Sequence, residues 1–211
     1  MKKKYSFLVV SFFRVTDPYS GASEVSYNFF KSIPSKNKKL IQFSNVNQDK
    51  KNIKNIKAKT IIEKILKIKQ MSEYIINRYK KEKNPVLIFE GASWAGYTFL
   101  LYYYLKNKLN NPKFIYHSHN IEYLLRKKNN NLIIAFFTKY LENYIGKKFD
   151  MFTSVSKLDQ KQLSKIYNFK TTIFSNGILL PKISKIKEKK LKYNYIFFCG
   201  SIEYKPNREA L

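Results

Sequence analysis

The chain has 211 residues, enough for one large domain or for one domain and part of another. Hydrophobic residues make up 44% of it and aromatic residues 17%, which excludes a globally disordered chain despite a formal net charge of +27. The single cysteine, Cys199, excludes an intramolecular disulfide, and no apolar run reaches the ~18 residues that a membrane-spanning helix needs. These features favour a cytoplasmic protein.

The charge comes from 41 basic and 14 acidic residues. Lysine accompanies Asn, Ile, Tyr and Phe throughout the chain, which indicates a compositional bias and favours a generally lysine-rich, solvated surface. A charge of this size still attracts phosphate-bearing partners. The alternative is therefore a protein that is peripheral on an anionic membrane surface, on its inner face. We expect no nucleic acid as partner, because the chain has no nucleic-acid-binding motif and no arginine-rich cluster.

Apolar, strand-like runs alternate with helical patterns along the chain. This alternation predicts an α/β fold, with a Rossmann-like, mostly parallel sheet and helices on both faces. The expected strands, in chain order, are 5–13, 39–44, 86–90, 114–117, 151–155 and 171–174. The expected helices are 22–32, 58–81, 97–109, 132–147 and 157–167.

Two of these segments have a second interpretation. The start, MKKKYSFLVVSFF, imitates a secretory signal, but its apolar run is short and no small-x-small cleavage site follows, so a buried first strand explains it better. In helix 58–81, Ile61, Ile62, Ile65, Ile68, Ile75 and Tyr79 share one stripe. This pattern is typical of a helix packed on a sheet, and a basic amphipathic helix lying on anionic lipid is the alternative.

The end of the chain indicates a second domain. Residues 1–178 account for the Rossmann-like domain, and the lysine-rich stretch 179–192 has the character of an interdomain linker. Residues 193–211 contain the run YNYIFFCGS, which is typical of a buried strand, followed by a loop and a helix start. A strand without neighbours cannot bury its faces. We therefore expect the chain to end just inside a truncated second domain.

Candidate functional residues follow the strands, because open α/β sheets bind ligands at the carboxyl ends of their strands. After the first strand, Gly21 stands at a loop-to-helix junction with Ser20 and Ser23 as candidate caps. An anion such as phosphate can dock at such a helix N-terminus. A simple turn glycine is an equal alternative, since the loop is neither a dinucleotide fingerprint nor a phosphate loop.

Both histidines of the protein lie at the carboxyl end of the expected strand 114–117: His117 ends it and His119 follows it. His117 and His119 cluster there with Asn120, Glu122 and Arg126. His119 is a candidate acid/base or a hydrogen-bond partner for a sugar hydroxyl. Glu122 and Arg126 are spaced i, i+4, which predicts that they pair on a helix face. No metal site is expected, because the only cysteine is remote and no third ligand is indicated.

Small polar residues follow the last two expected strands. Ser154 and Ser156 end one of them, and Asn176-Gly177 follows the other. Asn-Gly is first of all a turn signal. Together with the histidine segment, these strand ends form a plausible polar crevice.

Taken in order, the motifs resemble those of a known family. SGAS, HNIE, FDMFTSVSKLDQ, SNGI and FFCGSIEYKPNREAL resemble family 4 glycosyltransferases of the GT-B fold, over nearly the whole chain. The resemblance implies retaining, metal-independent transfer of a sugar from a nucleotide-sugar donor to a glycan or lipid-linked acceptor, in cell-surface polysaccharide synthesis. It implies no cofactor, and an N-terminal domain that mainly binds the acceptor.

The resemblance also implies roles for single residues. His119 would be the catalytic histidine at the cleft. The residues implied to bind acceptor or phosphate lie in the loops that follow the strands: Gly21, Ala22, Ser23, Asn120, Glu122, Ser154, Ser156, Asn176 and Gly177.

The chain departs from the family pattern in its second domain. That domain carries a pair of glutamates with seven residues between them, and we expect it to be truncated here after its first strand. Glu82 and Glu90 have this spacing but lie in the first domain, which indicates coincidence. SGAS also has a serine where many relatives have a second glycine. We therefore expect the isolated chain to be inactive. The alternative is a catalytically inactive, basic remnant that binds an acceptor or a membrane surface.

Overall fold

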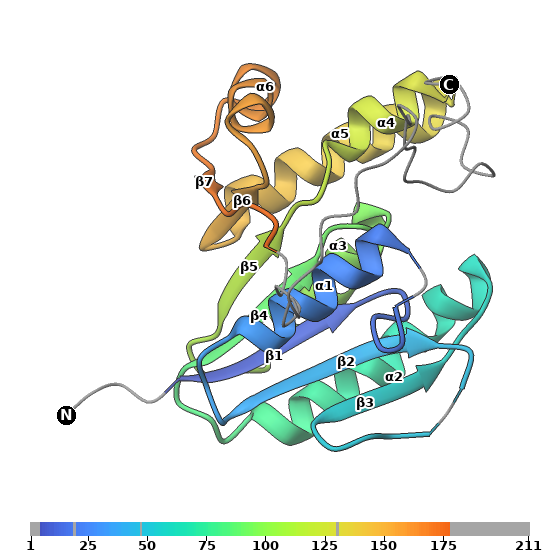
Figure 1. Ribbon diagram of the computed structural model, residues 1–211, viewed down its shortest axis with the longest axis vertical. Helices are drawn as coiled ribbons and strands as arrows, with labels where there is room; N and C mark the ends of the chain where they lie inside the picture. Colours follow the sequence, from blue (N-terminus) through green and yellow to red (C-terminus); the bar gives the residue numbers. More distant parts are fainter. Residues whose placement is uncertain (1–4, 19, 47, 130, 178–211) are drawn as a thin grey trace, which may run out of the picture. The chain divides into compact units, whose positions relative to one another are not determined.

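The computed structural model describes residues 5–177 except 19, 47 and 130, and its architecture is α/β (Figure 1). Within these residues seven parallel strands form a single sheet in the order β3-β2-β1-β4-β5-β6-β7. The strands are β1 (Ser6–Ser11), β2 (Lys38–Ser44), β3 (Ile53–Lys57), β4 (Pro85–Glu90), β5 (Lys113–His117), β6 (Met151–Ser154) and β7 (Thr172–Ile173). The six helices of this part of the chain are α1 (Gly21–Ser32), α2 (Ile61–Tyr79), α3 (Ala95–Leu105), α4 (Glu122–Lys128), α5 (Leu132–Lys148) and α6 (Lys157–Tyr167).

Helices lie on both faces of the sheet, which confirms the Rossmann-like prediction. α1 covers one face, where Phe30 and Ile33 pack near Val9, Leu40 and Ile88 of the strands. The larger core on the other face joins the opposite side chains of the same strands to α2, α3, α5 and α6. Because both faces are covered, the central strands are nearly continuous apolar runs, as parallel sheets require.

The strand order places a switch point beside β1. The chain first moves outward from β1 to β2 and β3, and then returns to add β4 on the other side of β1. In such sheets the loops after the two strands at the reversal separate and leave a crevice at the carboxyl edge. The residues that follow β1, β4 and β5 are therefore the ones that the fold gathers at a binding position.

All the predicted strands and helices within the described residues occur, most of them with shifted ends. Helix α2 begins at Ile61 instead of residue 58, because Thr60 and Glu63 form a capping box there. The predicted stripe of α2 is wrong at this end: Ile61, Ile62 and Ile65 are exposed, whereas the stripe from Ile68 onward is buried. The structure also has two elements that the prediction lacks, β3 and α4.

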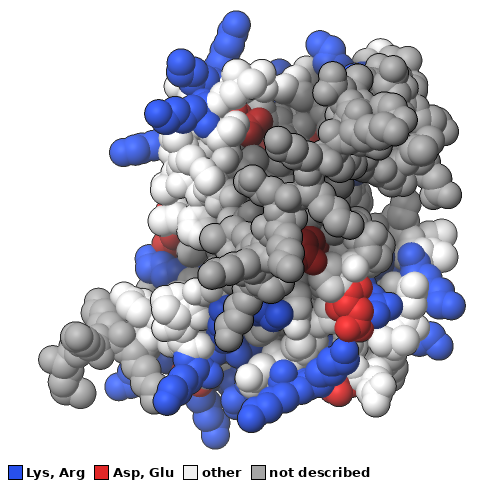
Figure 2. Space-filling model, viewed as in Figure 1, with Lys and Arg blue, Asp and Glu red and all other residues white. Residues whose placement is uncertain are grey.

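The expected linker 179–192 and the expected truncated domain 193–211, with Cys199, lie outside the described residues and stay predictions. Among the residues described, none of the helices combines the length and the apolar character that crossing a bilayer requires. Figure 2 shows the Lys and Arg side chains of one face in several separate groups instead of one patch. This distribution agrees with a generally lysine-rich surface.

A buried glutamine connects the loop after β1 to the edge of the sheet. Oε1 of Gln42, in β2, accepts hydrogen bonds from the backbone N–H groups of Val15 and Thr16, at 2.7 and 3.2 Å. Its Nε2 donates to the hydroxyl of Thr16 and to Oδ1 of Asn55 in β3, both at 2.7 Å. The buried amide thus has partners for both of its donor hydrogens and for its oxygen, as a buried polar group requires.

Candidate functional site

Helix α1 begins at the carboxyl edge of the sheet. Ser20 is its N-cap and forms a capping box with Ser23, so the expected capping is confirmed. A Cβ added to Gly21 would meet no other atom within 4 Å, and Gly21 has no positive φ. The structure therefore does not require glycine at this position on steric grounds. It leaves open space outside the first turn of α1.

The ends of β4 and β5 bring a carboxylate and an imidazole together. Glu90, the last residue of β4, is in register with His117, the last residue of β5. Side chains alternate along a strand, so Glu90 lies on the same face as Ile88, which is the face that α1 covers. Gly91 holds the two strand ends close: its N–H donates to the carbonyl of His117 at 2.8 Å, and an added Cβ would lie 2.8 Å from that oxygen.

Glu90 is the centre of a buried polar cluster. Its side chain is fully buried. Oε2 of Glu90 accepts hydrogen bonds from Nε2 of His119 at 2.7 Å and from the hydroxyl of Ser26, in α1, at 2.6 Å. Oε1 lies 3.2 Å from Nδ1 of His117. Four segments of the chain thus meet at one carboxylate: α1, the ends of β4 and β5, and the loop after β5.

The protonation of this cluster follows from its electrostatics. Burial alone would raise the pKa of Glu90, but the hydrogen bonds and charges of His117 and His119 outweigh it and lower the pKa to about 2. Glu90 is therefore ionised at neutral pH. An ionised carboxylate can only accept hydrogen bonds, so Nε2 of His119 and Nδ1 of His117 must carry the protons that they share with it.

His119 is left with one free ring nitrogen. In the neutral imidazole, a proton on Nε2 makes Nδ1 a hydrogen-bond acceptor. No group of the described residues makes a hydrogen bond to Nδ1 of His119. The geometry thus presents His119 as an acceptor for the proton of a hydroxyl group, with Glu90 behind it to stabilise the imidazolium that forms.

Glu142, in α5, fixes the loop that carries His119. Its carboxylate accepts hydrogen bonds from the backbone N–H groups of Glu122 and Tyr123, both at 3.0 Å, and so caps the start of α4. The hydroxyl of Tyr167 donates to the same carboxylate at 2.5 Å. Burial raises the pKa of Glu142 to about 7, although these three donors oppose the shift. The cap ties the residues directly after His119 to the helical layer.

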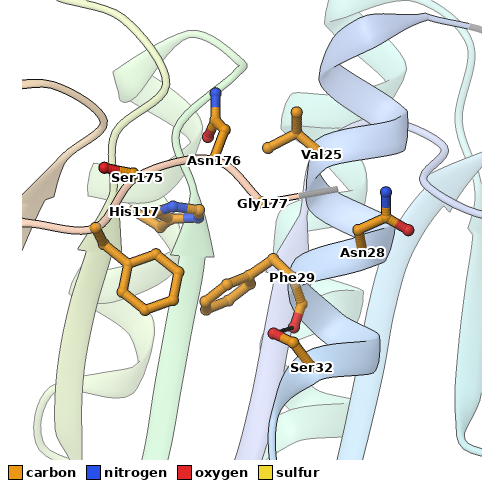
Figure 3. Close-up of a pocket in the computed structure, with 9 residues that line it drawn as sticks. Val25, Asn28, Phe29, Ser32, His117, Ser175, Asn176 and Gly177 are labelled. Carbon is orange, nitrogen blue, oxygen red and sulfur yellow. Dashed lines mark hydrogen bonds between the residues drawn. The ribbon is translucent and has the colours of Figure 1, made fainter. Parts of the chain in front are cut away.

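A small pocket adjoins the cluster on the other side of His117 (Figure 3). It has a volume of about 160 Å³ and lies between α1 and the segment that follows β7. Phe29 forms part of one wall, and its ring centroid is 4.5 Å from that of His117. Asn176 and Gly177 line the opposite wall. Nε2 of His117, one of the residues that line the pocket, is buried and has no hydrogen-bond partner among the described residues.

The structure places most of the sequence-predicted site residues at the carboxyl edge. Gly21, Ala22 and Ser23 form the first turn of α1, the helix that carries Ser26. Asn120 is exposed in the loop between His119 and α4. Asn176 and Gly177 line the pocket beside His117.

Three other predicted residues remain. Glu122 and Ser156 have hydrogen-bond partners within the domain, and Ser154 has none among the described residues. Glu122 is buried and pairs with Arg126 at 3.0 Å, which confirms the expected i, i+4 pair. Ser156 is the N-cap of α6 and accepts from the N–H of Asp159. Ser154 is buried, and its hydroxyl has no hydrogen-bond partner in the part of the chain that the structure describes.

Sequence analysis missed Glu90 and Ser26. Glu90 drew notice only as half of a glutamate pair with Glu82, and the two lie beyond opposite ends of the apolar run of β4. A usable signal was present, because VLIFE and FIYH both end on an ionisable residue at the carboxyl end of a strand. Nothing in the local sequence singles out Ser26 among the serines around α1.

Glu90, His117 and His119 also offer three ligand atoms that all lie within 4.8 Å of one another. Two ligands of a tetrahedral ion, each about 2.1 Å from it, stand about 3.4 Å apart. Nε2 of His119 and Oε2 of Glu90 are 2.7 Å apart, which is a hydrogen-bond distance. An ion would have to separate these two groups, so the present arrangement fits shared protons better than a metal.

The strand order and the position of the cluster define a Rossmann-like α/β domain with a carboxylate–histidine site next to its switch point. The chain matches no known protein-family profile and no curated protein sequence.

Proposed function

We propose that this domain is the acceptor-binding half of a glycosyltransferase that moves a sugar from a nucleotide-sugar donor to a glycan or lipid-linked acceptor. The observation that carries the proposal is His119 at the carboxyl edge, with Nε2 bound to the buried carboxylate of Glu90 and Nδ1 without a hydrogen bond from any described residue. Sugar acceptors react through a hydroxyl group, and a free imidazole nitrogen is suited to bind one. The motif resemblance to retaining, metal-independent family 4 enzymes points the same way.

The proposed roles follow from the geometry. Nδ1 of His119 accepts the hydrogen bond of the acceptor hydroxyl, and Glu90 orients the ring and stabilises its charged form. The open space at Gly21 lets a phosphate of the donor or of a lipid-linked acceptor approach the N–H groups of Gly21 and Ala22, whereas the N–H of Ser23 is already bonded to the Ser20 cap. The nucleotide-sugar is a substrate, and no further cofactor is required.

The transfer step needs a second wall for the cleft. Catalysis requires the donor, the acceptor and the charge-stabilising groups to converge in one geometry. The described residues offer His119 with Glu90 and the start of α1, which form one side of such a cleft. The isolated chain is therefore expected to bind acceptor but to show negligible sugar transfer.

A non-catalytic role is the second candidate. The net charge of +27 favours a basic protein that is peripheral on the inner face of the cytoplasmic membrane and holds an acceptor there. In this role the same cluster would bind the acceptor, and transfer would be absent in any assembly.

Acceptor binding can be measured at His119 directly. The histidine ring signals of the chain are followed by NMR during titration with free oligosaccharides and with polyprenyl-diphosphate-linked saccharides in detergent. We expect the His119 signals to move with at least one probe, and His119→Gln to weaken its binding tenfold or more. Glu82→Gln is the matched control, because Glu82 lies away from the carboxyl edge.

Two results would contradict the proposal. If no saccharide shifts the His119 signals or binds the wild-type chain better than His119→Gln, the site is not an acceptor site. If the isolated chain turns over a nucleotide-sugar at an enzyme-like rate, it is not a half-site.

A further inference from the structure

Helix α5 exposes an apolar face to solvent. Ile133, Phe136, Phe137 and Tyr140 are 74%, 70%, 56% and 63% exposed. Their spacing is i, i+3, i+4 and i+7, which places all four on one side of the helix. An amphipathic surface helix normally carries charged or polar residues on the side that faces water.

The buried face of α5 lies on the opposite side. It consists of Ala135, Thr138, Glu142 and Ile145, which contact the rest of the domain. The four exposed residues therefore do not continue the core stripe of the helix. They form a second apolar stripe, and an exposed patch of this kind is typical of an interaction site.

An apolar groove extends this stripe toward α3. The groove has a volume of about 340 Å³, and its lining contains no charged residue: Trp94, Gly96, Phe99, Leu100, Ile134, Phe137, Tyr140 and Leu141. Phe137 and Tyr140 belong both to the groove and to the exposed stripe. Tyr103 in α3 adds a further aromatic ring that is 61% exposed. The apolar surface is thus continuous over two helices.

The exposed charges around the stripe are basic. Lys127 and Lys128 end α4, directly before α5, and Lys139 lies in α5 beside the stripe. The acidic residues of these two helices, Glu122 and Glu142, are buried. The surface therefore combines apolar side chains, tyrosines and lysines without an exposed carboxylate of α4 or α5.

We propose that the outward face of α5 docks on the interfacial region of an anionic bilayer. Ile133, Phe136 and Phe137 enter the boundary of the acyl chains, Tyr140 lies at headgroup level, and the lysines contact lipid phosphates. A second copy of the chain fits less well, because a two-fold contact would bring the same lysines together. The proposal specifies the membrane partner named above and is independent of sugar transfer.

Helix α2 is the internal comparison. Ile62 and Leu66 are 71% and 72% exposed, and lysines surround them, so α2 was the membrane helix that the sequence suggested. However, Ile61 and Ile65 of α2 lie on the same side as buried Ile68, so half of its exposed apolar residues only continue the core stripe. A separate outward stripe with i, i+3, i+4, i+7 spacing occurs in α5.

Vesicle flotation tests this assignment. Wild-type chain, Phe136→Ser/Phe137→Ser and the control Ile62→Ser/Leu66→Ser are mixed with phosphatidylcholine vesicles, with or without phosphatidylglycerol. We expect wild type and control to float with the anionic vesicles. The α5 variant should bind these vesicles at least roughly tenfold more weakly than wild type. Both variants change exposed residues, so equal urea midpoints verify that folding is retained.

Trp94, the only tryptophan of the chain, provides a second readout because it lines the groove. Brominated acyl chains should quench its fluorescence in the wild type and the control, but not in the α5 variant. Three results would overturn the proposal: equal binding to neutral and anionic vesicles, equal binding of wild type and α5 variant, or no vesicle binding together with a dimer that the α5 variant abolishes. A negative result in the vesicle experiments would not contradict acceptor binding at His119, because the NMR titration also uses soluble saccharides and needs no membrane.

Discussion

The pKa values of two buried carboxylates of this domain are shifted in opposite directions. Glu90 and Glu142 are both fully buried, and each accepts three hydrogen bonds or close polar contacts. The pKa of Glu90 falls to about 2, whereas that of Glu142 rises to about 7. The partners explain the difference. Glu90 faces two imidazoles that can carry positive charge, while Glu142 has only neutral donors, two backbone amides and a phenol.

The comparison separates two uses of a buried acid. Neutral donors satisfy the oxygens of Glu142 but do not repay the loss of hydration of its charge, so it serves as a helix cap. Charged or chargeable partners keep Glu90 ionised without water. An ionised carboxylate can in turn orient His119 and stabilise its protonated ring, and this is the property that a reacting site needs.

Replacing Glu90 should give the largest effect. In Glu90→Gln the amide group would point N–H bonds at a ring nitrogen that also carries a proton, and the cluster loses its negative charge. We expect a loss of about 3–5 kcal/mol in the free energy of unfolding, as for other broken buried pairs. Urea denaturation at pH 7 measures it. A loss below 1 kcal/mol would show that the histidines do not depend on this carboxylate.

The pH dependence should distinguish the two acids. The folded-state pKa of Glu142 is raised from 4.5 to about 7, so its stabilising contribution is complete below pH 4.5 and is lost as the pH rises through 7. Such a shift corresponds to about 3 kcal/mol at most. Glu142→Gln, which resembles the neutral acid, should lack this decline, and the two proteins should differ in the pH profile of their urea midpoints.

The acid side of the profile belongs to Glu90. Its folded-state pKa lies below 4.5, so its contribution is present above pH 4.5 and is lost as the pH falls toward 2. Glu142→Gln should retain this acid limb. If Glu142→Gln flattened the acid limb and left the decline through pH 7, the assignment of the two acids would be reversed.

Gly91→Ala should affect the Glu90 region by steric conflict. The added Cβ would lie 2.8 Å from the carbonyl oxygen of His117 and 3.0 Å from Cα of Ser118, both backbone atoms. We expect a cost of about 1–3 kcal/mol and shifted NMR signals of both histidine rings. Gly21→Ala is the control and should change stability by less than about 0.5 kcal/mol, because its Cβ meets open space.

Tyr167→Phe should give the smallest change. It removes one of the three hydrogen bonds to Glu142 and should cost about 1 kcal/mol above pH 7, where Glu142 is charged. With one donor fewer, the decline in stability should move to higher pH. An unchanged midpoint of that decline would mean that the Tyr167 hydroxyl does not bind the carboxylate in solution.

The sheet and most helices could be predicted from sequence because their signals are local. The central strands are uninterrupted apolar runs, and α1, α2 and α6 each begin at a Ser or Thr cap. Strand β3 escaped prediction because Ile53 and Ile56 are separated by polar residues at the edge of the sheet, where lysine is tolerated. Helix α4 escaped because Ile121 supplies no side-chain cap, and Glu142 caps it from α5.

The candidate site was predictable in position but not in composition. Strand ends point to the carboxyl edge, and both histidines could be found there. The role of Glu90 depends on the register between β4 and β5, and the role of Ser26 depends on where α1 crosses the sheet. Neither the strand register nor the helix position can be inferred from the residues next to Glu90 and Ser26.

The buried amide of Gln42 also bears on the register of the edge strand β3 against β2. Strand β3 is short and carries two lysines, so its apolar residues alone discriminate weakly between alternative alignments. A shift of one residue would withdraw Asn55 from Gln42 and leave a buried N–H bond unpaired. Because Gln42 binds both Asn55 of β3 and the loop that leads to α1, its hydrogen bonds fix the register of the edge strand and the conformation of that loop together.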